Sequence, residues 1–142
     1  MEVPRQGLLP DIRMMQVVDF PIQKVWEAIA TSEGIAAWFM LNDFKPALGH
    51  MFFVDASPIG LIPCKVTLID PPNRLSYEWG KDWLLTFELR DLDGQTELTV
   101  VHSGWDVNKV AESGRTHTVA HEKLSLAWTV LINRLVRRAI KK

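Results

Sequence analysis

Cysteine is nearly absent from this sequence, because Cys64 is the only one among 142 residues. A lone cysteine excludes an internal disulfide and the usual multi-cysteine zinc clusters, and it fits a reducing compartment. Cys64 lies within a strand-like apolar run, and nothing in the sequence places a base beside it. We therefore expect a small buried hydrophobic residue there rather than a nucleophile.

Long apolar runs and an excess of charge are also lacking. No run approaches the ~20 apolar residues that span a bilayer, and the N-terminal residues do not form the apolar stretch of a secretory signal. Sixteen basic residues against seventeen acidic ones give a formal net charge of −1, so no global field attracts nucleic acid or an anionic membrane. We expect a cytoplasmic protein with no nucleic-acid partner and no membrane insertion.

Motifs of common enzyme classes are missing. The sequence has neither a phosphate-binding loop nor a dinucleotide-binding glycine pattern, and Ser103 lacks the flanking glycines of a nucleophile elbow. His117 and His121 are four residues apart and share a helix face, but two histidines make only half of a metal site. We expect both to be surface residues in the first turn of a helix. We expect no catalytic residue, metal ion or cofactor.

Tryptophan, by contrast, is abundant, with six residues in a chain that is 47% hydrophobic and 23% charged. This length and composition predict one domain spanning residues 1–142, with a core large enough to need no disulfide or metal. A buried tryptophan usually needs a partner for its indole N–H. Six of them suit either a large aromatic core or the lining of a cavity, and both interpretations stay open.

The N-terminal third predicts one strand followed by two short helices. Residues 12–18 read as a strand, and Pro21 then suits the first turn of a helix because its missing N–H would be unused there. The apolar residues of that helix fall on one stripe, formed by Val25, Trp26 and Ile29. The second helix, residues 32–38, follows at once.

Between about residues 49 and 102, short apolar runs alternate with turn residues, which is typical of an antiparallel meander. The predicted strands are residues 51–55, 62–70, 75–79, 83–89 and 96–102. Asp93-Gly94 is a strong hairpin signal between the last two strands. Alternate positions are apolar, as at Leu75, Tyr77 and Trp79, so we expect one apolar face and one solvated face.

Residues 115–142 predict one long helix, since neither proline nor glycine follows Gly114. Apolar residues recur along it at spacings of three and four, and the basic residues near its end suit the negative end of the helix dipole. The helix stripe and the apolar sheet face have to cover each other. The expected fold class is therefore α+β, with a curved antiparallel sheet of about six strands around a long C-terminal helix and two short helices after the first strand.

Four segments, in this order, resemble a known family. They are Pro21-x-x-x-Val25-Trp26-x-Ala28, Trp38-Phe39 after residues 31–34, residues 98–105, and Ala127-Trp128 followed by Ile132 and Leu135. Together with the order of elements, they resemble the helix-grip fold of the START-like (SRPBCC) superfamily. More narrowly, they resemble the bacterial single-domain relatives of the activator of heat-shock protein 90 ATPase. The resemblance implies a cytoplasmic protein linked to stress responses.

The chain departs from the family pattern in two places. The family usually has glycine before the tryptophan of the C-terminal helix, whereas this chain has Ala127. The added methyl group narrows the space between helix and sheet, so we expect a smaller cavity. The eukaryotic co-chaperone also has a separate N-terminal domain, for which we expect no room in this chain.

The resemblance implies a ligand cavity between the sheet and the C-terminal helix. The residues expected to line it are Trp26, Ile29, Trp38, Phe39, Tyr77, Trp79, Phe87, Val100, His102 and Trp128. Ligand sites are mostly apolar with a few placed polar groups, and His102 and the Tyr77 hydroxyl are the candidates for those groups. An alternative interpretation makes His102 a core histidine satisfied by a neighbouring backbone group.

The leading hypothesis is non-catalytic binding of a small hydrophobic molecule, either aromatic or lipid-like. A second hypothesis is a protein-interaction module, in which the outer sheet face or the long helix engages a partner such as a chaperone. A third is a cyclase, aromatase or hydrolase that works in the same cavity. That enzyme would need an acid or base of shifted pKa, and only His102, Tyr77 and His121 are candidates.

Overall fold

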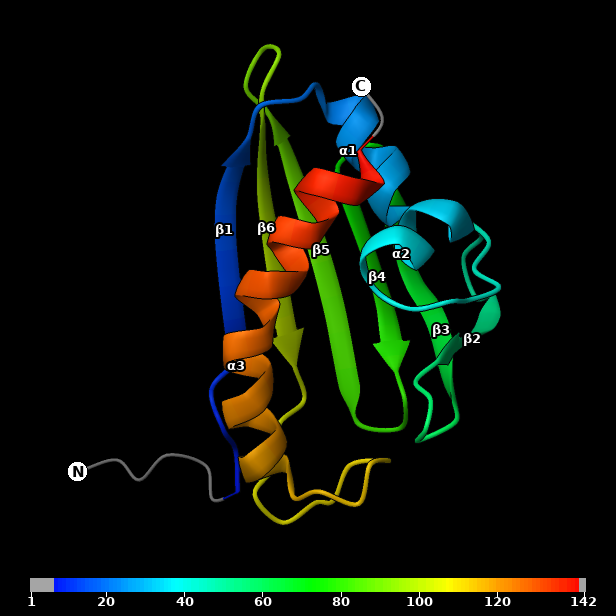
Figure 1. Cartoon of the computed structure of the whole chain (residues 1–142), viewed down its shortest axis with the longest axis vertical. Coiled ribbons are helices and arrows are strands. Elements are labelled where there is room, and N and C mark those ends of the chain that lie inside the picture. The colour runs from blue at the N-terminus through cyan, green and yellow to red at the C-terminus, as the bar shows by residue number, and fades with distance from the viewer. Residues whose placement is uncertain (1–6, 141–142) are drawn as a thin grey trace, which may run out of the picture.

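Six antiparallel strands form one curved sheet in the computed structural model, which describes residues 7–140. The strands are β1 (Ile12–Val18), β2 (Met51–Asp55), β3 (Leu61–Asp70), β4 (Arg74–Trp79), β5 (Trp83–Asp91) and β6 (Thr96–Ser103). Their spatial order is β1-β6-β5-β4-β3-β2, so β1 pairs with the last strand of the meander. The long helix α3 (His117–Arg134) lies across one face of this sheet (Figure 1). These features confirm the α+β helix-grip prediction.

Two short helices, α1 (Ile22–Ile29) and α2 (Ser32–Trp38), follow β1 as expected. Pro21 precedes α1 with φ −66°, and the side chain of Thr31 caps α2 by accepting a hydrogen bond from the Gly34 N–H at 3.0 Å. A Cβ atom at Gly34 would lie 2.6 Å from the backbone oxygen of Ala28. Glycine therefore lets α2 approach α1 closely.

The inner face of the sheet is apolar and buried, as the alternation predicts. Tyr77 lies opposite Leu85, and Phe87 lies opposite Val100, and all four side chains are buried. The outer face is not uniformly solvated, because Ser76 is buried and donates a hydrogen bond to the Thr86 hydroxyl at 3.0 Å. Small polar side chains on adjacent strands thus satisfy each other there.

The β5–β6 hairpin confirms its sequence signal. Asp93 and Gly94 have φ values of +62° and +96°, and two consecutive positive φ values are typical of a type I′ turn. This turn twists in the same sense as its flanking strands, which favours the long β5–β6 ladder.

The C-terminal helix is shorter at both ends than the range 115–142 predicts. Arg115 stays in the preceding loop, where its backbone oxygen accepts a hydrogen bond from the Ala111 N–H at 2.8 Å, and Thr116 caps the helix. After Arg134 the helix widens into a π-helical turn, η1 (Leu135–Ala139), and Ile140 is extended. Lys141 and Lys142, part of the predicted basic end, lie outside the described residues.

Candidate ligand-binding site

A cavity of about 470 Å³ opens at the end of the sheet where α3 begins. In Figure 1 this is the end at which the β2–β3 and β4–β5 turns meet the loop before α3. Its wall is formed by Met40, Asp55, Ala56, Ser57, Ile59, Ile62, Trp79, Trp83, Ala111, Glu112, Ser113, Arg115, Ala120, Lys123, Leu124 and Ala127. The volume falls within the usual range of small-molecule sites, and most of the wall is apolar.

Two tryptophans form the aromatic part of this wall. Trp79 ends β4 and Trp83 begins β5, and the two are direct partners in the antiparallel register. Their rings therefore lie on the same face, with centroids 5.1 Å apart. Both side chains are at least 92% buried, at 6% and 8% exposure, and neither indole N–H has a hydrogen-bond partner within residues 7–140.

Of the ten residues expected to line a cavity, Trp79 lies in this wall. The others pack in the core: Trp26, Ile29, Trp38, Tyr77, Phe87, Val100, His102 and Trp128 are buried, and the half-buried Phe39 stacks on Trp38 at 5.0 Å. The sequence interpretation missed Trp83, although its position directly across the turn from Trp79 was a usable signal. The apolar residues that α3 contributes, Ala120, Leu124 and Ala127, were also not among the ten, although Ala127 was expected to narrow the cavity.

His102 is a fully buried histidine enclosed by tryptophans. Its Nδ1 accepts a hydrogen bond from the Trp128 indole N–H at 3.0 Å, while the Trp105 indole donates to its backbone oxygen at 3.0 Å. Burial lowers the pKa of His102 to about 3, with smaller contributions from His121 and His117. The ring is therefore neutral and carries its proton on Nε2, which has no partner in the described part of the chain. The partner of this core histidine is therefore a side chain, on Nδ1 alone, and not the backbone group that the alternative interpretation expects.

Tyr77 and Cys64 are both buried, and both side chains keep their protons at neutral pH because their pKa values are raised. Burial raises the pKa of Tyr77 well above its ordinary value, with a smaller effect from Cys64. Burial is also the main cause that raises the pKa of the Cys64 thiol to about 12. Cys64 is thus the small buried hydrophobic residue that the sequence predicts. Neither residue lies in the cavity wall.

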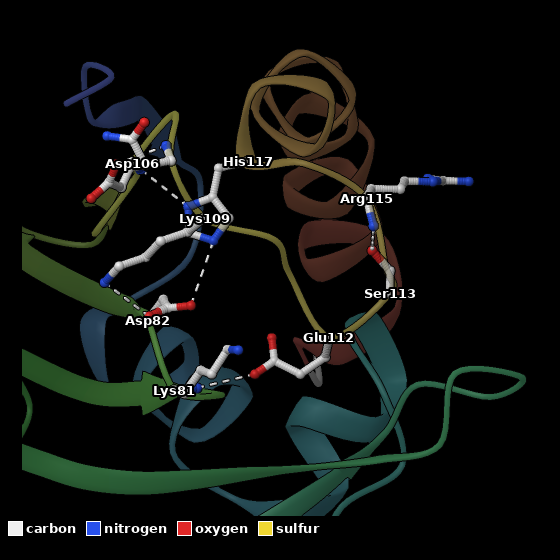
Figure 2. Close-up of polar contacts among 9 residues, drawn as sticks. Lys81, Asp82, Asp106, Lys109, Glu112, Ser113, Arg115 and His117 are labelled. Carbon is white, nitrogen blue, oxygen red and sulfur yellow. Dashed lines mark hydrogen bonds and ion pairs between the residues drawn. The ribbon is translucent and has the colours of Figure 1, made fainter. Parts of the chain in front are cut away.

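His117 is fully buried, so the expectation of a surface histidine is wrong for this residue. The loop before α3 folds back over it, and Figure 2 shows the resulting contacts. His117 Nδ1 accepts the Asp106 N–H at 3.0 Å, and its Nε2 lies 3.6 Å from Asp82 Oδ2. Lys109 Nζ lies 3.1 Å from the other oxygen of Asp82. These contacts join the β4–β5 turn to the start of α3.

His121 does not join His117 in a common site. Its Nε2 donates to the backbone oxygen of Pro10 at 2.8 Å, which ties the helix to the residues before β1. Within residues 7–140, no three His, Cys, Asp or Glu side chains lie close enough together to hold a metal ion. None of the helices in that range is long and apolar enough to cross a membrane.

The charged residues of the cavity wall, which form its rim, fall into two groups: the acidic Asp55 and Glu112, and the basic Arg115 and Lys123. The Glu112 carboxylate accepts the Lys81 N–H at 3.1 Å, and Asp55 accepts hydrogen bonds from the hydroxyl and N–H of Ser57. The Ser57 hydroxyl, followed by its N–H, lowers the pKa of Asp55. Arg115 and Lys123 have no acidic partner within residues 7–140.

Comparison with solved structures identifies close relatives of this fold. Protein BH1534 of Bacillus halodurans is 39% identical, with a TM-score of 0.84 over 96% of this chain and all of that chain. Protein MLL2253 of Mesorhizobium loti is 26% identical, with a TM-score of 0.77 over 90% of this chain and 95% of that one. The Aha1 dimer of Colwellia psychrerythraea shares the fold at 18% identity, with a TM-score of 0.71 over 89% and 93%.

No curated protein matches the sequence significantly. Residues 19–136 match the family model described as Activator of Hsp90 ATPase homolog 1-like protein. This range runs from the end of β1 into η1, and it contains all four segments on which the sequence resemblance rests. The chain therefore belongs to the Activator of Hsp90 ATPase homolog 1-like protein family of START-like proteins.

Proposed function

We propose that this protein binds a small, mainly apolar molecule, without catalysis, in the cavity of about 470 Å³ beside α3. The observation that supports this proposal is the cavity, whose wall is aromatic at Trp79 and Trp83 and aliphatic at Ile62 and Leu124. The START-like fold family binds small hydrophobic ligands. Removing the apolar surface of such a ligand from water would supply the affinity, at about 25 cal/mol per Å² before the costs of association.

The core residues behind the cavity extend this proposal. Trp79 packs edge-on against Phe39 at 5.1 Å, and Phe39 stacks on Trp128 at 6.2 Å. A larger ligand would reach the deeper expected residues by displacing the half-buried Phe39, which is the least enclosed ring of this set. Binding through the full set of ten residues stays a prediction.

Catalysis in the same cavity has less support. His102 and Tyr77 are buried outside the wall, and His121 bonds to the Pro10 backbone. An acid or base must come within hydrogen-bond reach of its substrate. A cyclase or hydrolase would therefore need a rearrangement that exposes one of these groups.

A protein-interaction role is favoured by one separate observation. Exposed apolar side chains gather around the edge strand β2: Leu41, Met51, Phe53 and Leu61. Exposed apolar patches of this kind commonly mark binding surfaces. A stoichiometric partner that is lost on substitution of Phe53 by Ser would support this second candidate. We further propose a cytoplasmic location and a link to stress responses, both on the family resemblance.

The test is a titration of the protein with a panel of aromatic and lipid-like molecules. Binding is monitored by intrinsic tryptophan fluorescence and by the melting temperature. Trp79 and Trp83 should report an occupant directly because they lie in the wall. A true ligand also raises the melting temperature by mass action. A saturable response to one chemical class supports the proposal, whereas no response across the panel contradicts it and favours the interaction role.

A further inference from the structure

The acidic groups of the cavity wall already accept hydrogen bonds from the protein. Glu112 accepts the backbone N–H of Lys81, and Asp55 accepts both donors of Ser57. Gly80 makes the first contact possible, because a side chain at that residue would collide with the Glu112 carboxylate. Each of these carboxylates is thus engaged by a backbone N–H group of a turn, the β4–β5 turn for Glu112 and the β2–β3 turn for Asp55.

The basic groups of the same wall are not engaged in this way. Arg115 and Lys123 line the cavity, are exposed, and form no ion pair within residues 7–140. Figure 2 shows the guanidinium of Arg115 directed away from the carboxylates of Glu112 and Asp82. Lys109, by contrast, pairs with Asp82 at 3.1 Å. The rim therefore has two cations free to meet an anion.

The aromatic wall adds two more donors. The indole N–H groups of Trp79 and Trp83 are buried and have no acceptor in the described part of the chain. An indole N–H can donate but cannot accept a hydrogen bond, and leaving such a group unsatisfied when buried is destabilising. The unengaged polar groups of this wall are thus hydrogen-bond donors.

We propose that the preferred ligand is an apolar acid, an aliphatic or aromatic body that carries a carboxylate, whose oxygens meet Arg115 and Lys123 at the rim. The inference rests on the proposed function and specifies its ligand class. An apolar body would occupy the wall formed by Ile62, Leu124 and the two tryptophans. An acceptor oxygen placed deeper would satisfy an indole N–H. An amine would bring a third cation to the rim, and a neutral alcohol would gain no charge-assisted contact.

The experiment compares three head groups on two apolar bodies by calorimetry. The probes are decanoate, decanol and decylamine, and naphthoate, naphthalenemethanol and naphthylmethylamine. The carboxylate should bind about tenfold more tightly than the alcohol on the same body, and the amine most weakly. The preference should shrink as salt is added, because rim charges are screened.

A double variant, Arg115→Gln with Lys123→Gln, separates charge from shape. It should weaken carboxylate binding about tenfold, which removes the preference over the alcohol, and leave alcohol binding unchanged. The control, Lys45→Gln with Arg137→Gln, makes the same change in net charge at exposed residues outside the wall. It should leave both affinities unchanged. Melting temperatures of both doubles check that the fold is retained.

The outcomes separate this inference from the proposal beneath it. Equal binding of the three head groups, or equal weakening by both double variants, overturns the apolar-acid inference and leaves the binding function standing. No binding by any of the six probes overturns both. Carboxylate preference that disappears only in the Arg115 and Lys123 double variant supports both.

Discussion

Gly104 follows β6 in a conformation that only glycine adopts easily. Its φ is +95°, and a Cβ atom there would collide with the backbone oxygen of Asp82 in the β4–β5 turn. Gly94 has nearly the same φ, +96°, but nothing lies within 4 Å of a Cβ atom at that residue. The two glycines therefore share a backbone requirement and differ in crowding.

We expect Gly104→Ala to lower the free energy of unfolding by about 3 kcal/mol or more, because backbone has to move to make space. Gly94→Ala should lower it by about 1–2 kcal/mol, the cost of the left-handed conformation alone. Urea denaturation of the two variants measures the difference. Equal losses of unfolding free energy in the two variants would mean that the close approach of Gly104 to Asp82 does not affect stability.

His102 predicts a pH dependence of stability with a definite sign. Its pKa is lowered from 6.5 to about 3 in the folded protein, chiefly by burial. Between these pH values His102 binds a proton in the unfolded state but not in the folded state. The free energy of unfolding therefore falls as the pH falls. The slope from this group is about 1.4 kcal/mol per pH unit in that window.

The matched variant is His102→Gln, whose side-chain oxygen can still accept the Trp128 N–H but does not titrate. Between about pH 7 and about pH 4.5, the variant should lose about 2 kcal/mol less stability than the wild type. Urea denaturation at both pH values gives this difference, in which the carboxylates common to both proteins cancel. An identical pH slope would exclude the buried neutral state of His102.

At the scale of elements, capping decides where α3 begins. Thr116 accepts the Val119 N–H at 3.3 Å, and Thr129 lies exposed within the same helix. Thr116→Ala should lower the free energy of unfolding by about 1 kcal/mol because one helix N–H loses its acceptor. Thr129→Ala should leave stability unchanged or raise it slightly, since alanine has the higher helix propensity. Thermal denaturation of both variants tests this, and a larger loss from Thr129→Ala would contradict it.

Most elements could be predicted from the sequence because their signals are local. Strand alternation and the Asp93-Gly94 turn depend on neighbouring residues, and they locate β4, β5 and β6. The ends of α3 could not be predicted in this way. Its start is capped locally by Thr116 but also depends on the contact of His117 with Asp82, which is distant in sequence. Its widening at Leu135 breaks a periodicity that the sequence continues.

At the scale of the whole molecule, the cavity should close without loss of the fold. Ala127 lies in its wall, whereas the neighbouring Leu126 is 77% exposed. Ala127→Leu should fill part of the space and weaken any ligand found in the panel at least about tenfold, with little change in melting temperature. Leu126→Ala should leave the affinity unchanged. Retained binding in Ala127→Leu would place the ligand elsewhere on the molecule.

Trp79 is the one residue of the ten expected that lies in the cavity wall, because the others are packed in the core. The inner-face residues of the sheet are close enough to the helices that Trp38, Phe39 and Trp128 fill the middle of the layer. The open space lies instead at one end, where three turns and α3 meet. That one domain spans residues 1–142 stays a prediction.

The sequence by itself determined the fold class, the order of the elements and the family, because periodicity, turn residues and short motifs are local features of the sequence. Only the tertiary structure decided that His117 is buried, that the Trp128 indole donates to His102, and that Arg115 and Lys123 border the cavity. These features join residues distant in sequence. They depend on how side chains fill the space between helix and sheet, which no local pattern specifies.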